Sequence, residues 1–141
     1  MRYKYFSLQC CLPNKPLSNI EIIDAAKNLP LCGFRVAFLR NTLLTKTKLN
    51  ECSILNLDSS PGDGTHRVIR FEKCKDKFSF DSYGVHPLTE LIAYLKSPIF
   101  YNSELVQQNG EVFCGHLCLF ALKQLSLGNN LQAVINYLIL L

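Results

Sequence analysis

The chain has 141 residues, of which 48% are hydrophobic and 18% are charged. This length is typical of one domain, expected to span residues 1–141, and the composition excludes a disordered chain. The net charge of +4 is compatible with weak contact to DNA but is too small to indicate a nucleic-acid-binding protein.

The first expected element is a helix that begins near Ser18. Ser18 and Glu21 have the spacing of a capping box, in which each side chain bonds the other residue's backbone N–H. Apolar residues then recur at helical spacing, and Pro30 is expected to end the helix. Alternating apolar residues predict a strand at 34–40, and a second strand is expected at 52–57.

A segment at 58–64 that ends in "PGDG" is rich in turn-forming residues and separates the second strand from a third strand at 65–73. Val68 and Phe71 of this third strand are expected to lie in the core. The residues "CKDK" predict a tight turn, and the next strand, at 78–84, is expected to pair with the third strand as a hairpin.

The C-terminal part of the chain is mostly helical in pattern. A helix is expected at 87–96 with Pro87 in its first turn, and 99–111 predicts a strand or an extended loop. The helix that begins at Cys114 is apolar on nearly all sides, which is typical of a central, buried helix. A last helix is expected at 129–141. Together these elements predict an α+β domain with helices packed against a small mixed or antiparallel sheet.

The chain has seven cysteines, at positions 10, 11, 32, 52, 74, 114 and 118. Their number and positions help to predict the redox compartment and possible metal binding. The number is odd and the first residues lack the pattern of a signal peptide, so we expect free thiols in an intracellular, reducing compartment. No run of about 18 apolar residues predicts a membrane span. Cys114, His116 and Cys118 lie close in sequence, and a zinc site formed with Cys10 and Cys11 is an alternative interpretation.

Cys114 stands at the start of the apolar helix and is followed by Gly115. A helix N-terminus carries partial positive charge and unsatisfied N–H groups, which stabilise a thiolate and an oxyanion. Gly115 is expected to leave room beside the sulfur for a substrate carbonyl. The competing interpretation is an inert buried thiol, which is the commoner role of a buried cysteine.

A cysteine hydrolase also needs a general base and a group that orients it. His66 directly follows the glycine-rich loop, and Asp81 ends the strand that we expect to pair with the strand of His66. Gln107 and Gln108 precede Cys114 by seven and six residues, where an amide could stabilise an oxyanion. Taken singly, each residue could equally be a surface loop or turn residue.

Three motifs, "GTHRV", "FDSYG" and "VQQNGEVFCGHLC", follow one another in this chain. In order and spacing they resemble the motifs of adenain-like cysteine proteases, the maturation proteases of adenoviruses and of Maverick/Polinton-type mobile elements. A more distant likeness is to the SUMO-specific proteases. The resemblance covers roughly residues 19–127 and implies a papain-like α+β fold in which the nucleophile begins the central helix.

The resemblance implies a role for each residue that matches a motif. Cys114 would be the nucleophile, His66 the general base and Asp81 the residue that orients the imidazole. Gln107 would form the oxyanion hole with the backbone N–H of Cys114. The spacing of Gln107 suits the adenain branch and that of Gln108 suits the SUMO-protease branch, so both glutamines stay candidates.

The function that the resemblance implies is an endopeptidase that cleaves capsid or core precursor proteins, in the host nucleus or the virion. It needs no metal or cofactor, although a peptide or DNA could act as an activator. Arg67 stands where the family has Trp, and we expect its charge to turn toward water and to weaken catalysis. The alternatives are a SUMO- or ubiquitin-like deconjugating protease, a catalytically inactive scaffold and a zinc-binding structural protein.

Overall fold

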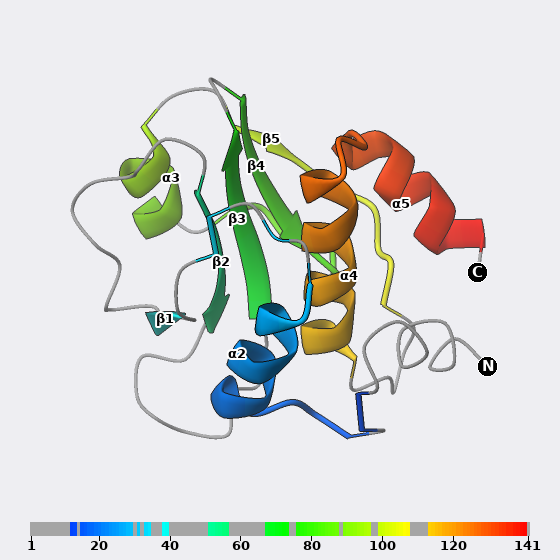
Figure 1. Cartoon of the computed structure of the whole chain (residues 1–141). Coiled ribbons are helices and arrows are strands. Elements are labelled where there is room, and N and C mark those ends of the chain that lie inside the picture. Colours follow the sequence, from blue (N-terminus) through cyan, green and yellow to red (C-terminus); the bar gives the residue numbers. More distant parts are fainter. Residues whose placement is uncertain are drawn as a thin grey trace.

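The computed structural model describes residues 12–13, 15–29, 31, 33–34, 38–39, 51–56, 67–73, 76–87, 89–96, 99–107 and 113–140. Within these ranges, helices and a single mixed sheet form an α+β domain (Figure 1). The strands are β1 (Phe38–Leu39), β2 (Glu51–Asn56), β3 (Arg67–Lys73), β4 (Asp76–Asp81) and β5 (Phe100–Tyr101). The helices are α2 (Asn19–Lys27), α3 (Thr89–Leu95), α4 (Cys114–Ser126) and α5 (Leu131–Leu140).

The sheet has the strand order β1-β2-β3-β4-β5, with an antiparallel centre and parallel edges. The expected hairpin is confirmed, because β3 and β4 pair from Val68 opposite Asp81 to Lys73 opposite Asp76. Its turn is shorter than the four residues expected, since Asp76 already belongs to the ladder. The register places the end of β4, at Asp81, beside the start of β3.

Helix α4 forms the centre of the core, as its apolar sequence predicts. It lies between the sheet and α5, with α3 on the other side of the sheet (Figure 1). Residues 114–122 of α4 are all buried. Residues 117–122 pack in one cluster with the sheet residues Cys52, Ile54, Ile69, Phe71 and Phe80. The expected core positions Val68 and Phe71 are confirmed as buried.

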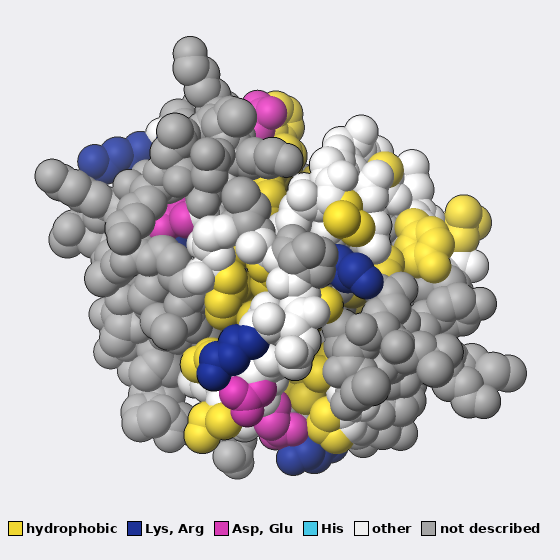
Figure 2. All heavy atoms as spheres, in the orientation of Figure 1, with side chains coloured by type: hydrophobic (Ala, Val, Ile, Leu, Met, Phe, Trp, Pro, Cys, Tyr) yellow, Lys and Arg dark blue, Asp and Glu magenta, His cyan; other side chains and the backbone are white. Residues whose placement is uncertain are grey.

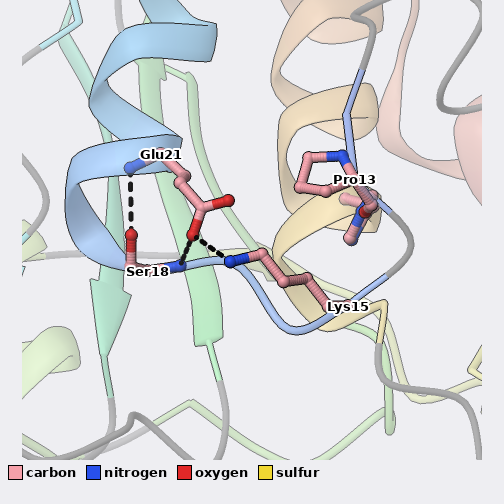
Figure 3. A network of polar contacts seen from close by, with 5 residues as sticks. Pro13, Lys15, Ser18 and Glu21 are labelled. Carbon is pink, nitrogen blue, oxygen red and sulfur yellow. Dashed lines mark hydrogen bonds and ion pairs between the residues drawn. The ribbon is translucent and has the colours of Figure 1, made fainter.

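Helix α2 begins with the expected capping box (Figure 3). The N–H of Glu21 donates to Ser18 Oγ at 3.2 Å, and the N–H of Ser18 donates to Glu21 Oε1 at 3.3 Å. Lys15 adds an ion pair with Glu21 at 3.2 Å. The hydrogen bonds from Ser18 and Lys15 lower the pKa of Glu21. The helix ends at Lys27, three residues before Pro30.

Several boundaries differ from the expected ones. Strand β4 begins at Asp76 and ends at Asp81, whereas this strand was expected at 78–84. Helix α3 begins at Thr89, so the expectation that Pro87 lies in its first turn is wrong; Pro87 precedes the helix. Of the strand expected at 34–40, Phe38 and Leu39 form β1, while Phe34 makes an isolated parallel bridge to Cys52. The rest of that strand and the turn at 58–64 lie outside the described residues.

Candidate functional site

Cys114 is the first residue of α4 and has 8% of its surface exposed. The N-cap residue, Phe113, provides no side-chain hydrogen bond to the first turn. The partial positive charge of the helix N-terminus is therefore not neutralised by an N-cap oxygen. This placement is the one that the sequence predicts for Cys114.

Gly115 faces the start of α2. A β-carbon at Gly115 would lie 3.4 Å from Leu17 Cβ and 3.5 Å from Ile22 Cδ1, which is ordinary van der Waals contact. The start of α2 therefore packs against the first turn of α4 at this position. The expectation that Gly115 leaves room for a substrate stays a prediction.

His116 joins α4 to the segment that precedes α2. Its Nε2–H donates to the carbonyl of Pro13 at 2.8 Å, and its ring packs edge-on against Phe113. Figure 3 shows Pro13 beside the helix. Burial lowers the pKa of His116, although the bond to Pro13 acts in the opposite direction.

The zinc interpretation gains no support from these contacts. In the ranges that the structure describes, no three His, Cys, Asp or Glu side chains are placed to hold a metal ion. Cys10 and Cys11, the other proposed ligands, lie outside those ranges.

We expect the protein to lose stability as pH falls through the range in which a free imidazole binds a proton. The unfolded chain protonates His116 near pH 6.5, whereas the folded chain resists protonation until a lower pH. The stability from neutral His116 is thus present above pH 6.5 and is lost below it, by at most about 1.4 kcal/mol per pH unit for one proton. Urea unfolding between pH 8 and 5 would measure this slope.

The matched variants are His116→Gln, which should flatten the slope, and His86→Gln, at an exposed histidine, which should leave it unchanged. The measurements end at pH 5 so that protonation of Glu21 contributes little to the slope of stability against pH. An unaltered slope in His116→Gln would contradict the prediction.

Asp81 ends β4 and is held there by Asn102. The Asp81 N–H donates to Asn102 Oδ1 at 2.9 Å, and Asn102 Nδ2 donates to the Asp81 carbonyl at 2.6 Å. The Asn102 amide thus extends the β4–β5 pairing by one residue. Asp81 Oδ1 also accepts the N–H of Tyr83 at 2.8 Å, so the turn-forming role expected as an alternative is present.

Gln107 is bound to the residue that follows Asp81. Ser82 Oγ donates to Gln107 Oε1 at 2.6 Å, and the Ser82 carbonyl accepts the N–H of Gln107 at 2.9 Å. Gln107 is buried, and its amide oxygen is fixed by Ser82. The amide nitrogen therefore points away from Ser82. Gln108 lies outside the described residues.

Gly84 allows this turn to close on the segment that carries Gln107. Its N–H donates to the Asp81 carbonyl at 2.8 Å, and its φ of +69° favours glycine. A β-carbon there would lie 2.5 Å from the Ser103 carbonyl oxygen. The glycine of "FDSYG" is thus required for the contact between Asp81–Ser82 and the residues around Gln107.

Cys118 lies one turn after Cys114, and burial and the charges around it shift the pKa of its thiol. Its thiol donates to the carbonyl of Arg67 at 3.4 Å. Burial raises the pKa of Cys118 well above its usual range; negative charge on Cys114 and Asp81 raises it further, and Arg67 lowers it.

Arg67 does not turn toward water, as the sequence led us to expect. Its side chain is 2% exposed, and Nη2 donates to Asn19 Oδ1 at 3.0 Å. The expectation is wrong because Asn19, the first residue of α2, supplies an oxygen that takes the place of water. Among the described residues, Nε and Nη1 have no hydrogen-bond partner.

Of the expected site residues, the structure joins Gln107 to the end of β4 at Asp81 through Ser82, and it places Cys114 at the start of the buried helix α4. His66 lies outside the described residues; it directly precedes Arg67 in the sequence. Sequence reasoning missed Ser82 and Asn102 as supports of the site. Ser82 belongs to the motif "FDSYG", which could have indicated it, whereas no pattern marks Asn102.

The described surface around α2 carries mixed charges. Lys15 pairs with Glu21, and Lys27 lies 3.6 Å from Asp24, so blue and magenta side chains alternate over α2 in Figure 2. No broad basic patch covers the described part of this face. Among the described helices, none is long and apolar enough to cross a membrane.

Two hollows on the described surface lie away from Cys114. One, of about 350 Å³, lies between α4 and α5 and is lined by Phe120, Gln124 and Tyr137 among others. The other, of about 380 Å³, lies between β5 and α5 beside Phe100 and Tyr101. Neither is lined by the expected site residues.

Comparison of the sequence with models of known protein families gave no match, and a search of curated proteins found no similar one. The likeness to adenain-like proteases therefore rests on the three motifs quoted above. The structure itself shows an α+β domain with a mixed sheet on a central helix, and it places two of these motifs, those of Asp81 and of Gln107, in contact.

Proposed function

We propose that the protein is a cysteine endopeptidase of the adenain type. The observation that carries the proposal is the arrangement at the start of α4. Cys114 begins a buried helix without a side-chain cap, and the charge of Asp81 acts on Cys118, one turn further along that helix. Gln107 is fixed beside Asp81 through Ser82, with its amide nitrogen turned away from that hydroxyl.

The chemistry that these residues support is acyl transfer through a thioester. The Cys114 thiolate attacks the peptide carbonyl carbon, forming a C–S bond while the carbonyl π electrons move to the oxygen. The Gln107 amide and the N–H groups of α4 stabilise this oxyanion. The imidazolium of His66 gives its proton to the leaving nitrogen, and the C–N bond breaks. Neutral His66 then takes a proton from water, whose oxygen attacks the thioester and releases the acid and the thiolate.

Asp81 is the residue proposed to orient His66. One of its carboxylate oxygens accepts the Tyr83 N–H. Strand β3 begins at the residue after His66, and Val68 of β3 lies opposite Asp81 in the ladder. His66 therefore precedes the direct strand partner of Asp81 by two residues in the sequence.

The family likeness supplies the substrate class, namely capsid or core precursor proteins of a virus or mobile element. It also supplies the finer fold assignment, a papain-like arrangement with the nucleophile on the central helix. Activation by a peptide or by DNA belongs to the same proposal. The mixed charges over α2 offer DNA no basic surface on the described part of that face.

A catalytically inactive scaffold is the second candidate, and one observation favours it. Arg67 occupies the place of the family's Trp, is buried, and keeps the N–H groups of Nε and Nη1 without partners among the described residues. A buried charge at this position could disturb the imidazole next to it.

The experiment that tests the function is trapping of the acyl-enzyme. The protein is incubated with peptide reporters from capsid-type sequences and with a ubiquitin-like substrate ending in Gly-Gly, and thioesters are located by mass spectrometry. We expect hydrolysis of capsid-type peptides and an acyl group on Cys114. Cys114→Ala should abolish both, whereas Cys52→Ala, at a buried thiol of β2, should retain them.

The other outcomes separate the alternatives. Cleavage restricted to the Gly-Gly substrate would replace the proposal with a deconjugating protease. Absence of both hydrolysis and acylation in the folded protein would overturn it in favour of the inactive scaffold.

A further inference from the structure

Arg67 carries a buried charge that lacks a counter-ion within the described part of the chain. Its side chain is 2% exposed, and its one hydrogen bond among the described residues goes to the neutral amide of Asn19. Nε and Nη1 have no partner there, and the ion pairs of the described residues do not include Arg67. A buried charge is costly unless it is paired, so a negative group is expected nearby.

Arg67 contacts α4 at its carbonyl and the start of α2 at its guanidinium. The carbonyl accepts a hydrogen bond from the thiol of Cys118. The guanidinium bonds Asn19, which lies in the chain between Leu17 and Ile22, the residues that touch Gly115. Arg67 therefore joins the start of α2 to the part of α4 that carries Cys114 and, one turn later, Cys118. These two cysteines are four residues apart and share one face of the helix.

The titratable groups around this point come from three elements besides β3. Cys118 and His116 lie on α4, Asp81 on β4 and Glu21 on α2. Glu21 is engaged by Ser18 and Lys15, and Asp81 by the Tyr83 N–H. Burial holds Cys118 in its neutral thiol form and also favours neutral His116. Cys114 begins α4 without a side-chain N-cap, so the helix terminus would stabilise a negative charge on its sulfur.

We propose that the guanidinium of Arg67 is the fixed counter-ion of a Cys114 thiolate. The helix terminus and Arg67 then act on the sulfur together. Arg67 is a charge partner that acts through Cys114 and does not touch the substrate. The inference deepens the proposed function, on which it rests for the role of Cys114 as the nucleophile.

A permanent counter-ion has a consequence that an imidazolium does not have. An imidazolium loses its charge when it deprotonates, whereas a guanidinium stays charged at every pH at which the protein is folded. The Cys114 thiolate should therefore persist without a proton on His66. The substitution of the family's Trp by Arg would then change how the thiol is activated.

The test is the pH dependence of alkylation at Cys114 in the folded protein. Iodoacetamide labelling is followed at single cysteines by mass spectrometry of peptides, between pH 5 and 10. In the wild type we expect an apparent pKa below the value of about 8.5 for a free thiol. Arg67→Met should raise it by about one unit or more, and Arg67→Lys, which keeps the charge, should preserve most of the depression.

A second variant covers the case in which Arg67→Met does not fold. Asn19→Asp keeps the shape of the side chain and places a carboxylate at the oxygen that Nη2 bonds. That carboxylate should pair with the guanidinium and so raise the apparent pKa of Cys114, as Arg67→Met does. Because Asp is also favourable in the first turn of a helix, this variant should fold.

Two results would overturn the inference. The first is an unchanged pKa of Cys114 in folded Arg67→Met or in Asn19→Asp. The second is a thiolate that depends on His66 alone, seen as a full loss of the depression in His66→Ala with no effect of Arg67→Met. Hydrolysis by Cys114 without any effect of Arg67 would leave the proposed function standing, while an effect of Arg67 on alkylation without hydrolysis would leave only this inference.

Discussion

Replacement of Gln107 by Glu should lower kcat for peptide hydrolysis by about 10²–10³-fold, the typical loss of one oxyanion-hole donor. The variant keeps the shape of the side chain, and Ser82 Oγ can donate to a carboxylate as it does to the amide oxygen. The backbone bond from Gln107 to the Ser82 carbonyl is unaffected. The substitution changes the amide nitrogen: its donor N–H is replaced by a carboxylate oxygen, which repels a developing oxyanion. KM should change little, because the interaction forms in the transition state.

A charge-matched control is Gln132→Glu on the exposed surface of α5, which should leave kcat unchanged. Ser82→Ala offers an intermediate case, since it releases the amide oxygen without removing the amide. It should lower kcat by less than Gln107→Glu does. Activity of Gln107→Glu within twofold of the wild type would show that another group, such as Gln108, binds the oxyanion.

The parts of the fold that local chemistry determines were predictable from the sequence. The Ser18–Glu21 capping box forms with both of its bonds, and the helix that begins at Cys114 is buried over its first nine residues. In these elements the deciding interactions join residues three or four apart. A pattern of that range can be read without knowing the fold.

The parts that depend on distant residues were not predictable. Arg67 was expected at the surface, but its partner Asn19 lies 48 positions away in the chain. The start of α2 packs beside Gly115, and no local pattern indicates this contact. The local sequence shows only that a buried Arg67 would need a hydrogen-bond acceptor. The tertiary arrangement decides which residues lie beside these two positions.

The candidate site divides in the same way. The motifs named Cys114, Asp81 and Gln107, and the last two are joined through Ser82. The support from Asn102 could not be predicted, because it follows the two-residue strand β5, which the sequence left as a strand or a loop. Its amide continues the pairing of β4 after β5 ends, and this depends on the register of the sheet.

Another feature that no local pattern predicts is the buried ion pair between Arg70 and Glu51. We expect Glu51→Gln to lower the free energy of unfolding by about 3–5 kcal/mol. Arg70 Nη1 lies 2.8 Å from Glu51 Oε1, and the two side chains are 0% and 2% exposed. Strand alternation turns Arg70 away from Ile69 and Phe71, and so away from α4. Glu51→Gln keeps the size of the side chain but leaves the guanidinium buried without a compensating charge.

Urea or thermal unfolding followed by circular dichroism would measure the loss, and two controls isolate its cause. Asp24→Asn removes a carboxylate from an exposed pair with Lys27 and should change stability little, since water screens that pair. The double variant Glu51→Met with Arg70→Met removes both charges, so most of the stability should return, because a buried pair replaced by apolar residues is often neutral. If the double variant were as unstable as Glu51→Gln, the shape and hydrogen bonds of Arg70 would matter more than its charge. A stability of Glu51→Gln close to that of the wild type would show that the charge of Arg70 is compensated by other groups on this side of the sheet.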